Sequence, residues 1–359
     1  MSTSQLFEPL SLARGPILKN RLFLAPMTNR QSYPDGVVSD DEYHWLTMRA
    51  KGGFALTMTA ASHVQAVGQG FAGQLGVFGD QHLEGLSRLA AGIKAYGSVS
   101  SIQLHHAGIR SPKEQVPNPV GASDDAETGS CGLTLGEVEQ LRDDFISAAL
   151  RAEKAGFDGA EVHGAHGYIL TQFLSSETNR RTDRYGGSAE NRARLLFEII
   201  DGIRAQCGAD FQLGLRLSPE RFGLVFGEVR DLAAEVLRQA KIDYLEISAW
   251  DVNKEPEDEE YQGRKLMSYF TELERGGVRL GAAGKIMDAQ TAASVLEEGC
   301  DFAMIGRAGI LRHDFPERVE RDPNYQSPAL PVSAQHLRDE GLSDTFVKYM
   351  SGWSGFVEG

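Results

Sequence analysis

Segments with the alternation of a β-strand and segments with the spacing of an α-helix take turns along the whole chain. Residues 211–217 alternate apolar with polar or small side chains, and they follow a helical stretch that Ser188 opens and Gly208 closes. Strand-like patterns occur in eight places: 21–26, 54–59, 101–106, 159–164, 211–217, 244–249, 278–283 and 301–306. Helical patterns lie between most of them, for example at 83–96, 135–155, 229–240 and 288–298.

Eight such units predict an α/β fold, a closed (β/α)₈ barrel, rather than a doubly wound sheet, because no glycine-rich dinucleotide fingerprint follows the first strand. A chain of 359 residues would suggest two or more domains from length alone, but barrels with insertions reach this size as one domain. We therefore expect a single barrel domain over residues 1–359, with long loops at its C-terminal face and a tail from about residue 313.

Polar residues occupy the strand faces opposite the aliphatic residues, which in a barrel is the interior. These residues are Gln103, His105, Glu161, His163, Arg216, Glu246 and Ser248. A barrel interior is normally apolar, and a buried polar group without a partner costs about 1–3 kcal/mol. The pattern therefore predicts a polar ligand in the mouth of the barrel.

Two long segments interrupt the alternation. Residues 109–133 and 251–275 exceed ordinary connections and are interpreted as mobile loops or lids. We assign no catalytic role to the acidic run in the second segment. The aromatic residues near the end of the chain predict a tail that packs against the barrel or against a neighbouring subunit. The sequence therefore leaves open whether the protein forms a homo-oligomer.

Composition excludes several classes of partner. The formal charge of −14 disfavours nucleic acid and anionic membrane surfaces. The chain has neither an apolar run of membrane-spanning length nor a secretory leader, which predicts a soluble, cytoplasmic protein. Three cysteines, Cys131, Cys207 and Cys300, lie far apart, which disfavours a zinc ribbon, an iron–sulfur cluster or a disulfide framework.

His163, His166 and Tyr168 come together where the strand 159–164 ends. All three can bind or protonate a substrate oxygen, and strand ends are where parallel α/β proteins keep their chemistry. The alternatives are a zinc pair and two packed histidines. No third and fourth metal ligand is evident in the sequence, so we expect no metal site.

The sequence resembles the old yellow enzyme family of FMN-dependent ene-reductases from NRLFLAPMT (20–28) to MIGRAGILR (304–312). The most specific part is the HxxHxY pattern of residues 163–168, followed by NRRTD, YGG and ENR in the family's order. The resemblance implies the barrel fold, FMN in the C-terminal mouth and NAD(P)H as the hydride donor.

The resemblance also implies roles for the three residues. His163 and His166 match the pair that hydrogen-bonds the carbonyl oxygen of an activated alkene, and Tyr168 matches the proton donor. Hydride transfer through flavin N5 to the β-carbon builds negative charge on that oxygen, which two N–H donors stabilise. Tyrosine then protonates the α-carbon.

Ten positions match the family's FMN contacts: Pro26, Met27, Thr28, Ala61, Gln103, Arg216, Gly284, Lys285, Gly306 and Arg307. The last four fall on the two phosphate-binding turns, where barrel enzymes commonly hold a phosphate. Some relatives carry cysteine in place of Thr28, so a different flavin potential is implied. From the residues alone, Arg216 could equally be a structural ion-pair partner of Glu161 or Glu246.

The chain departs from the family pattern at the substrate side. Relatives show QLxHAGR where this chain has an extra imidazole at His105 and Ile109 in place of arginine. After the sixth strand relatives often have Ser-Gly, whereas this chain reads Ser248-Ala249-Trp250-Asp251. His105, Trp250 and Tyr33 are therefore candidates for the substrate pocket.

We predict an FMN-dependent NAD(P)H oxidoreductase that reduces activated C=C bonds of enones, maleimides and nitroalkenes by a ping-pong route. One alternative is a non-catalytic flavin-binding or electron-storage protein. Two others are the larger dienoyl-CoA reductase or amine dehydrogenase branch, which adds iron–sulfur and dinucleotide domains, and a flavin-free barrel hydrolase or aldolase. No motif identifies the physiological alkene, the preference for NADH or NADPH, the stereochemistry or the oligomeric state.

Overall fold

The computed structural model describes residues 2–359 and contains a closed barrel of eight parallel strands. Its strands follow one another around the barrel in the order β1, β10, β9, β8, β7, β6, β3 and β2. Their bounds are β1 (Leu22–Leu24), β2 (Leu56–His63), β3 (Val99–His105), β6 (Gly159–Gly164), β7 (Gln212–Leu217), β8 (Tyr244–Ser248), β9 (Arg279–Ala283) and β10 (Phe302–Ile305). All eight expected strands are present, so the predicted (β/α)₈ fold is confirmed.

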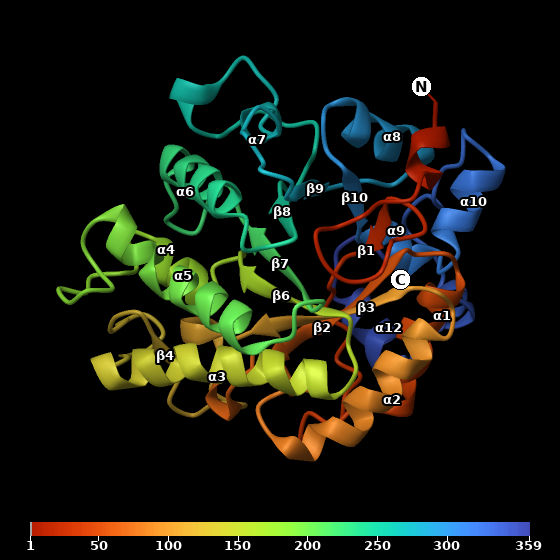
Figure 1. The fold of residues 1–359 in the computed structure, drawn as a ribbon. Helices are drawn as coiled ribbons and strands as arrows, with labels where there is room; N and C mark the ends of the chain where they lie inside the picture. Colours follow the sequence, from red (N-terminus) through yellow and green to blue (C-terminus); the bar gives the residue numbers. More distant parts are fainter. Residues whose placement is uncertain (1) are drawn as a thin grey trace.

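Helices surround the strands in Figure 1, and the N-terminal segment, in red, crosses the ring. The helices are α1 (Asp40–Lys51), α2 (Leu83–Lys94), α3 (Leu135–Lys154), α4 (Ile169–Leu174), α5 (Ala189–Gln206), α6 (Phe226–Gln239), α7 (Ser268–Thr271), α8 (Ala289–Glu297), α9 (Arg307–Leu311), α10 (Phe315–Arg321), α11 (Ala334–Asp339) and α12 (Asp344–Ser351). The longer helices, such as α2 and α5, bury an apolar stripe and leave most of their charged residues outside it, as the 3.6-residue period requires.

The second strand runs further than its sequence pattern suggested. Alternation predicted an end at residue 59, but β2 continues to His63 after its register shifts between Met58 and Ala61. A bulge of this kind turns the following side chains and hides the period-two pattern. Beyond it, His63 pairs with His105 of β3.

Three aromatic rings fill the lower interior of the barrel. Phe23 stacks on Phe302 with ring centroids 4.2 Å apart, and Tyr244 meets Phe302 edge-on at 5.6 Å. Two glycines make this packing possible. A Cβ on Gly214 would lie 2.0 Å from Tyr244 Cζ, and one on Gly281 would lie 2.1 Å from Phe302 Cε2. Because these rings fill the lower half of the barrel, a ligand site is expected at the other end.

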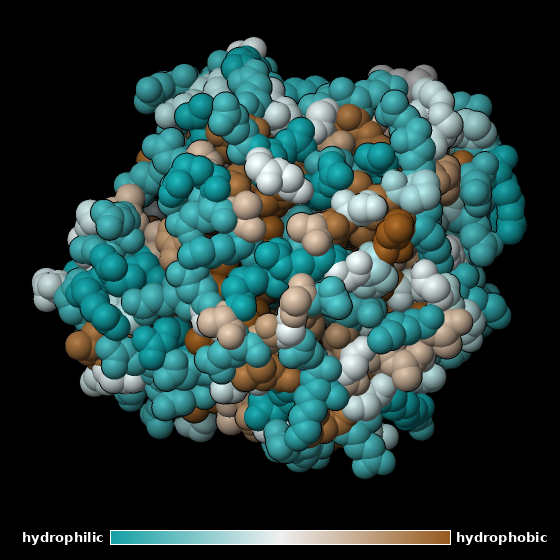
Figure 2. Space-filling view, in the orientation of Figure 1, coloured by the Kyte–Doolittle hydropathy of each residue, from teal (hydrophilic) through white to brown (hydrophobic). Residues whose placement is uncertain are grey.

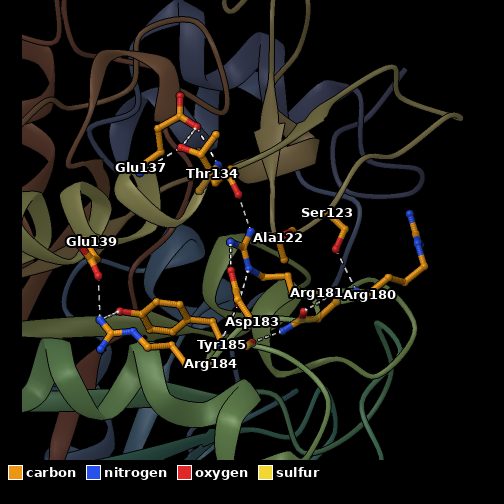
Figure 3. A network of polar contacts seen from close by, with 12 residues as sticks. Ala122, Ser123, Thr134, Glu137, Glu139, Arg180, Arg181, Asp183, Arg184 and Tyr185 are labelled. Carbon is orange, nitrogen blue, oxygen red and sulfur yellow. Dashed lines mark hydrogen bonds and ion pairs between the residues drawn. The ribbon is translucent and has the colours of Figure 1, made fainter.

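The NRRTD segment, family-specific in sequence, anchors the long segment 109–133. Arg181 donates from Nη1 to the carbonyl oxygens of Ala122 and Leu133, and its Nε donates to Asp183 Oδ1 at 3.1 Å. Figure 3 shows this network between the two segments. Within 109–133, the short strands β4 (Val120–Gly121) and β5 (Cys131–Gly132) pair with each other. The motif therefore has a structural role in fixing segment 109–133, and it is separate from the predicted catalytic residues.

Ion pairs fasten the other long segment, 251–275, to the loop after β7. Lys254 pairs with Glu220, and Arg221 pairs with Glu257 of the acidic run. The backbone N–H of Glu257 also donates to Glu220 at 2.7 Å. At least part of the acidic run thus has defined partners on a neighbouring loop.

The tail beyond residue 312 is helical, although the sequence pattern weakens there. Three short helices, α10 to α12, form it, and Ser333 and Ser343 cap the last two by accepting backbone hydrogen bonds. Helices of six to eight residues carry too few turns for their periodicity to be recognised.

Hydrophilic side chains cover most of the face seen in Figure 2, with hydrophobic ones showing between them in small groups. Among residues 2–359, no helix has both the length and the apolar character that crossing a membrane would require.

Candidate functional site

A cavity of 320 Å³ opens where the strands of the barrel end. This volume lies in the range of small-molecule sites, and the carboxyl ends of barrel strands are where such folds carry their chemistry. The last residues of β8, β9 and β10 and the segments that follow β1, β8, β9 and β10 line it, among them Ala25 to Thr28, Ser248, Trp250, Ala283 to Met287, Met304, Gly306 and Arg307.

The C-terminal tail covers part of this cavity. Tyr349 and Met350 of α12 and Trp353 beyond it belong to the lining. The Arg30 guanidinium lies 4.8 Å from the centre of the Tyr349 ring, which ties the tail to the loop after β1. The tail aromatics therefore contact the barrel of their own chain, one of the two alternatives that the sequence left open.

All of the predicted FMN contacts line the cavity except Ala61 and Gln103; those in the lining are Pro26, Met27, Thr28, Arg216, Gly284, Lys285, Gly306 and Arg307. Ala61 and Gln103 are register partners on β2 and β3. Gln103 is buried, and its Nε2 donates to Glu161 Oε1 at 2.7 Å.

One end of the cavity suits an anion. Arg307 has neither an ion pair nor a side-chain hydrogen bond among residues 2–359, and it begins α9, whose first N–H groups lack intrahelical acceptors. A Cβ on Gly306 would have only Met27 Sδ within 4 Å, at 3.9 Å, so the Gly306 backbone faces open space. Lys285 is engaged with Asp251, its Nζ 2.9 Å from Oδ2. Gly306 and Arg307 are therefore freer than Lys285 to bind an anion.

Arg216 brings a second cation to the cavity from inside the barrel. Its Nε lies 2.8 Å from Glu246 Oε1, and its Nη2 donates to Ser248 Oγ at 3.2 Å. Burial raises the pKa of Glu246 to about 8, while the Arg216 charge pulls it down. Burial likewise raises the pKa of Glu161, and its Oε2 has no partner. Arg216 is therefore both an ion-pair partner of Glu246 and a cavity residue.

These groups fit FMN. Met27, Ile286 and Met304 give the cavity apolar surface for a flat ring, and Arg216 offers a rigid, permanent cation where reduced flavin carries negative charge. Gly306 and Arg307 offer backbone access and a guanidinium for the phosphate.

Three histidines, here called the imidazole chain, run from the barrel interior to the cavity. His105 Nδ1 lies 3.1 Å from His163 Nδ1, and His163 Nε2 lies 2.9 Å from His166 Nδ1. His166 Nε2 in turn lies 2.8 Å from Ser248 Oγ. Burial, reinforced by neighbouring positive groups, holds the pKa of all three well below the usual value. The chain is therefore neutral, with one N–H and one lone pair on each ring.

His166 has a backbone conformation that few non-glycine residues adopt. Its φ is 63°, and its N–H donates to Ser218 Oγ at 2.9 Å while Arg110 donates to its carbonyl oxygen. Strained positions of this kind persist where neighbours hold them, and they gather at functional sites. The two contacts place the imidazole at the rim of the cavity.

Tyr168 lies against the imidazole chain. Its ring centroid is 4.3 Å from that of His105 and 5.2 Å from that of His163. The Arg110 guanidinium stands 4.9 Å from the same ring. Burial raises the pKa of Tyr168, and the positive charge of Arg110 works in the opposite direction. The phenol therefore stays protonated at neutral pH, next to a cation that would favour loss of its proton.

The three candidates for the substrate pocket lie in different surroundings. Trp250 lines the cavity, is 62% exposed, and has the Arg221 guanidinium 5.5 Å from its ring. His105 is buried behind His163 instead of lining the cavity. Tyr33 is half exposed and also lies outside the lining.

Sequence reasoning missed Arg110 and the tail residues of the lining. The family pattern has an arginine where this chain has Ile109, yet the next residue, Arg110, brings a guanidinium to Tyr168. The sequence offers one signal for this role: an arginine stands one position later than in the family pattern. The sequence shows Tyr349 and Trp353 as aromatic residues of the tail, but their place in the lining depends on how α12 folds back across the barrel mouth.

The sequence profile of the NADH:flavin oxidoreductase / NADH oxidase family matches residues 5–326. The chain belongs to this family. A probable NADH-dependent flavin oxidoreductase, YqiG of Bacillus subtilis (strain 168), is 38% identical over 333 residues, which are 89% of this chain and 89% of the relative.

Solved structures of the old yellow enzyme type share the fold. Morphinone reductase in complex with tetrahydroNAD has a TM-score of 0.78 at 28% identity, covering 95% of this chain and 96% of that one. Old Yellow Enzyme from Pichia sp. AKU4542 also gives a TM-score of 0.78 at 28% identity, covering 91% and 89%. The resemblance to the old yellow enzyme family is confirmed, and the chain is an NAD(P)H-dependent flavin oxidoreductase with FMN as its cofactor.

Proposed function

We propose that this member of the family reduces C=C bonds conjugated to carbonyl or nitro groups, with enones, maleimides and nitroalkenes as the substrate class. NAD(P)H and the alkene would use the same cavity in alternating half-reactions, with residues 1–359 acting as one FMN-binding unit. The observation that carries the proposal is the 2.9 Å contact between His163 Nε2 and His166 Nδ1, with His166 lining the cavity and Tyr168 beside the ring of His163.

His163 and His166 would bind the carbonyl or nitro oxygen of the alkene. An oxygen placed between His163 Nε2 and His166 Nδ1 can accept an N–H from each ring. Negative charge develops on this oxygen during reduction, and donors already in position stabilise it without reorganisation. Because both rings are neutral, they would act as hydrogen-bond donors and keep their protons.

Tyr168 would protonate the α-carbon of the alkene. Burial keeps its phenol protonated, and Arg110 would stabilise the phenolate left behind. A role for Arg110 is supported by its position over the ring and by the absence of an ion-pair partner for it among the described residues.

FMN, when bound, supplies the hydride transfer that links NAD(P)H to the alkene. Pro26, Met27, Thr28 and Arg216 would hold its ring, and Ala61 and Gln103, which lie outside the cavity lining, are the further ring contacts that the family pattern implies. Gly284, Lys285, Gly306 and Arg307 would hold the phosphate, with Arg307 the freest cation of the set.

The proposal is tested by separating the two half-reactions without oxygen. NAD(P)H should bleach the yellow absorbance of the FMN-loaded protein, and an enone, a maleimide or a nitroalkene should restore it. Bleaching without restoration by any of the three alkenes would contradict the proposal and leave the alternative of a flavin-binding, electron-storing protein. That alternative needs neither the imidazole pair nor the phenol beside it, which is why we favour the enzyme.

A further inference from the structure

The imidazole chain reaches further than the substrate-binding pair. His105 belongs to β3 and is 1% exposed, and His163 is the only hydrogen-bond partner of its ring among the described residues. The other ring nitrogen of His105, Nε2, is buried and unpartnered. At the opposite end, Ser248 Oγ contacts His166 Nε2 and also accepts a hydrogen bond from Arg216. A buried imidazole and a hydroxyl thus stand directly behind the two rings.

The number of protons on the three rings limits the tautomers that the imidazole chain can adopt. Each neutral ring carries one proton, and a hydrogen bond between two ring nitrogens holds one proton. When His163 and His166 bond to each other at 2.9 Å, one of the two facing nitrogens is therefore a bare acceptor. Only one N–H is then available at the cavity rim.

A substrate oxygen that accepts from both rings requires a different arrangement. His163 must carry its proton on Nε2 and His166 must carry its proton on Nδ1. The rear nitrogens, His163 Nδ1 and His166 Nε2, are then bare and must each accept a hydrogen bond, since burial makes an unpaired nitrogen costly. The groups in position to donate are His105 Nδ1–H and Ser248 Oγ–H. Because the Arg216 guanidinium can only donate, it occupies a lone pair of Ser248 and leaves the hydroxyl proton free to turn to His166.

We propose that His105 and Ser248 are positioning residues that set the tautomers of His163 and His166, so that both facing N–H groups converge on one substrate oxygen. This inference rests on the proposed function, because it assumes a carbonyl or nitro oxygen at that point. Each ring keeps its one proton, so no net proton is taken up or released when the oxygen binds. Only the nitrogen that carries the proton changes.

The test uses the FMN-loaded protein in its oxidised state with cyclohexenone as the probe, because an oxidised flavin has no hydride to donate to it. Nitrogen NMR of histidine-labelled protein distinguishes protonated from bare ring nitrogens. In the complex we expect a bare Nδ1 on His163 and a bare Nε2 on His166, with protons on the two facing nitrogens. Protons on the two rear nitrogens in the complex would overturn the inference.

Substitutions give a second readout. His105→Asn keeps an N–H donor near the position of Nδ1, whereas His105→Leu removes it, and both lose the ring packing against Tyr168. We expect His105→Leu to weaken cyclohexenone binding about 5- to 30-fold relative to His105→Asn, as the loss of one buried hydrogen bond implies. Ser248→Ala should likewise weaken binding relative to Ser248→Thr. Equal affinities within each pair would contradict the proposal.

The two proposals fail in distinguishable ways. If the protein binds cyclohexenone with the expected tautomers but never reduces an alkene, the positioning role stands and the proposed function falls. If alkenes are reduced but the tautomers are reversed, the positioning role alone falls. The NMR measurement on the wild-type protein tests the positioning role even if the His105→Leu protein does not fold.

Discussion

Replacing Gly306 by alanine should separate FMN binding from folding. A Cβ at this position meets only Met27 Sδ, at 3.9 Å, so the added methyl group enters the cavity without striking protein atoms. There it would stand between the backbone and the phosphate that we place at Gly306 and Arg307. The loss of one charge-assisted hydrogen bond, about 1.5–3 kcal/mol, would weaken FMN binding about 10- to 150-fold.

Two controls make this prediction sharp. Riboflavin lacks the phosphate, so its affinity for the apoprotein should be nearly unchanged by Gly306→Ala. Gly136→Ala, a helical position where an added Cβ also meets open space, should leave FMN binding intact and the fold at least as stable.

Thermal unfolding of the apoprotein checks that the substitution leaves the fold intact. Quenching of FMN fluorescence during titration gives the affinity. An unchanged FMN affinity, or an equal loss for FMN and riboflavin, would refute the placement of the phosphate.

Four further predictions follow from the same geometry. Gly214→Ala would overpack Tyr244 at a cost of about 1–3 kcal/mol, and an unchanged midpoint of thermal unfolding would count against the packing described. Tyr168→Phe should slow flavin reoxidation by an enone about 100- to 10,000-fold and spare reduction by NAD(P)H, which stopped-flow absorbance can check. Arg307→Gln should weaken FMN about 10- to 150-fold but not riboflavin, and equal losses would argue against a phosphate contact. The imidazole chain has lowered pKa values in the folded protein, so the unfolded chain binds more protons below about pH 6.5. Stability should therefore fall as the pH drops below that value, and less steeply in His105→Asn, as unfolding measured across pH would show.

The barrel was predictable because each strand carries its own signal. Alternation in 211–217 and the capped helix before it are local patterns, and eight repetitions leave few folds that fit. The tail was harder to predict because α10 to α12 are short and depend on packing for their stability. The extension of β2 to His63 was hidden by its bulge.

The site was predictable only in part. Strand-end polar residues such as His163 and Arg216 could be placed in one mouth, since parallel strands all end there. Contacts between loops were not encoded in any single segment. Arg110 reaches Tyr168, and Trp353 reaches the cavity, only because separate loops and the tail fold over the same opening.

The pairing of Gln103 with Glu161 and of Arg216 with Glu246 also required the structure. Register determines which buried carboxylate meets which donor, and sequence left Glu161 and Glu246 equally open as partners of Arg216. Arg216 and Glu246 prove to be register partners on β7 and β8.

A crystal structure of the FMN-loaded protein with a bound phenol tests the central claim most directly. We predict the flavin ring against Pro26 to Thr28, the phosphate at Gly306 and Arg307, and the phenol oxygen between His163 Nε2 and His166 Nδ1. A flavin bound outside the 320 Å³ cavity, or a phenol bound while the two imidazoles remain bonded to each other, would contradict it.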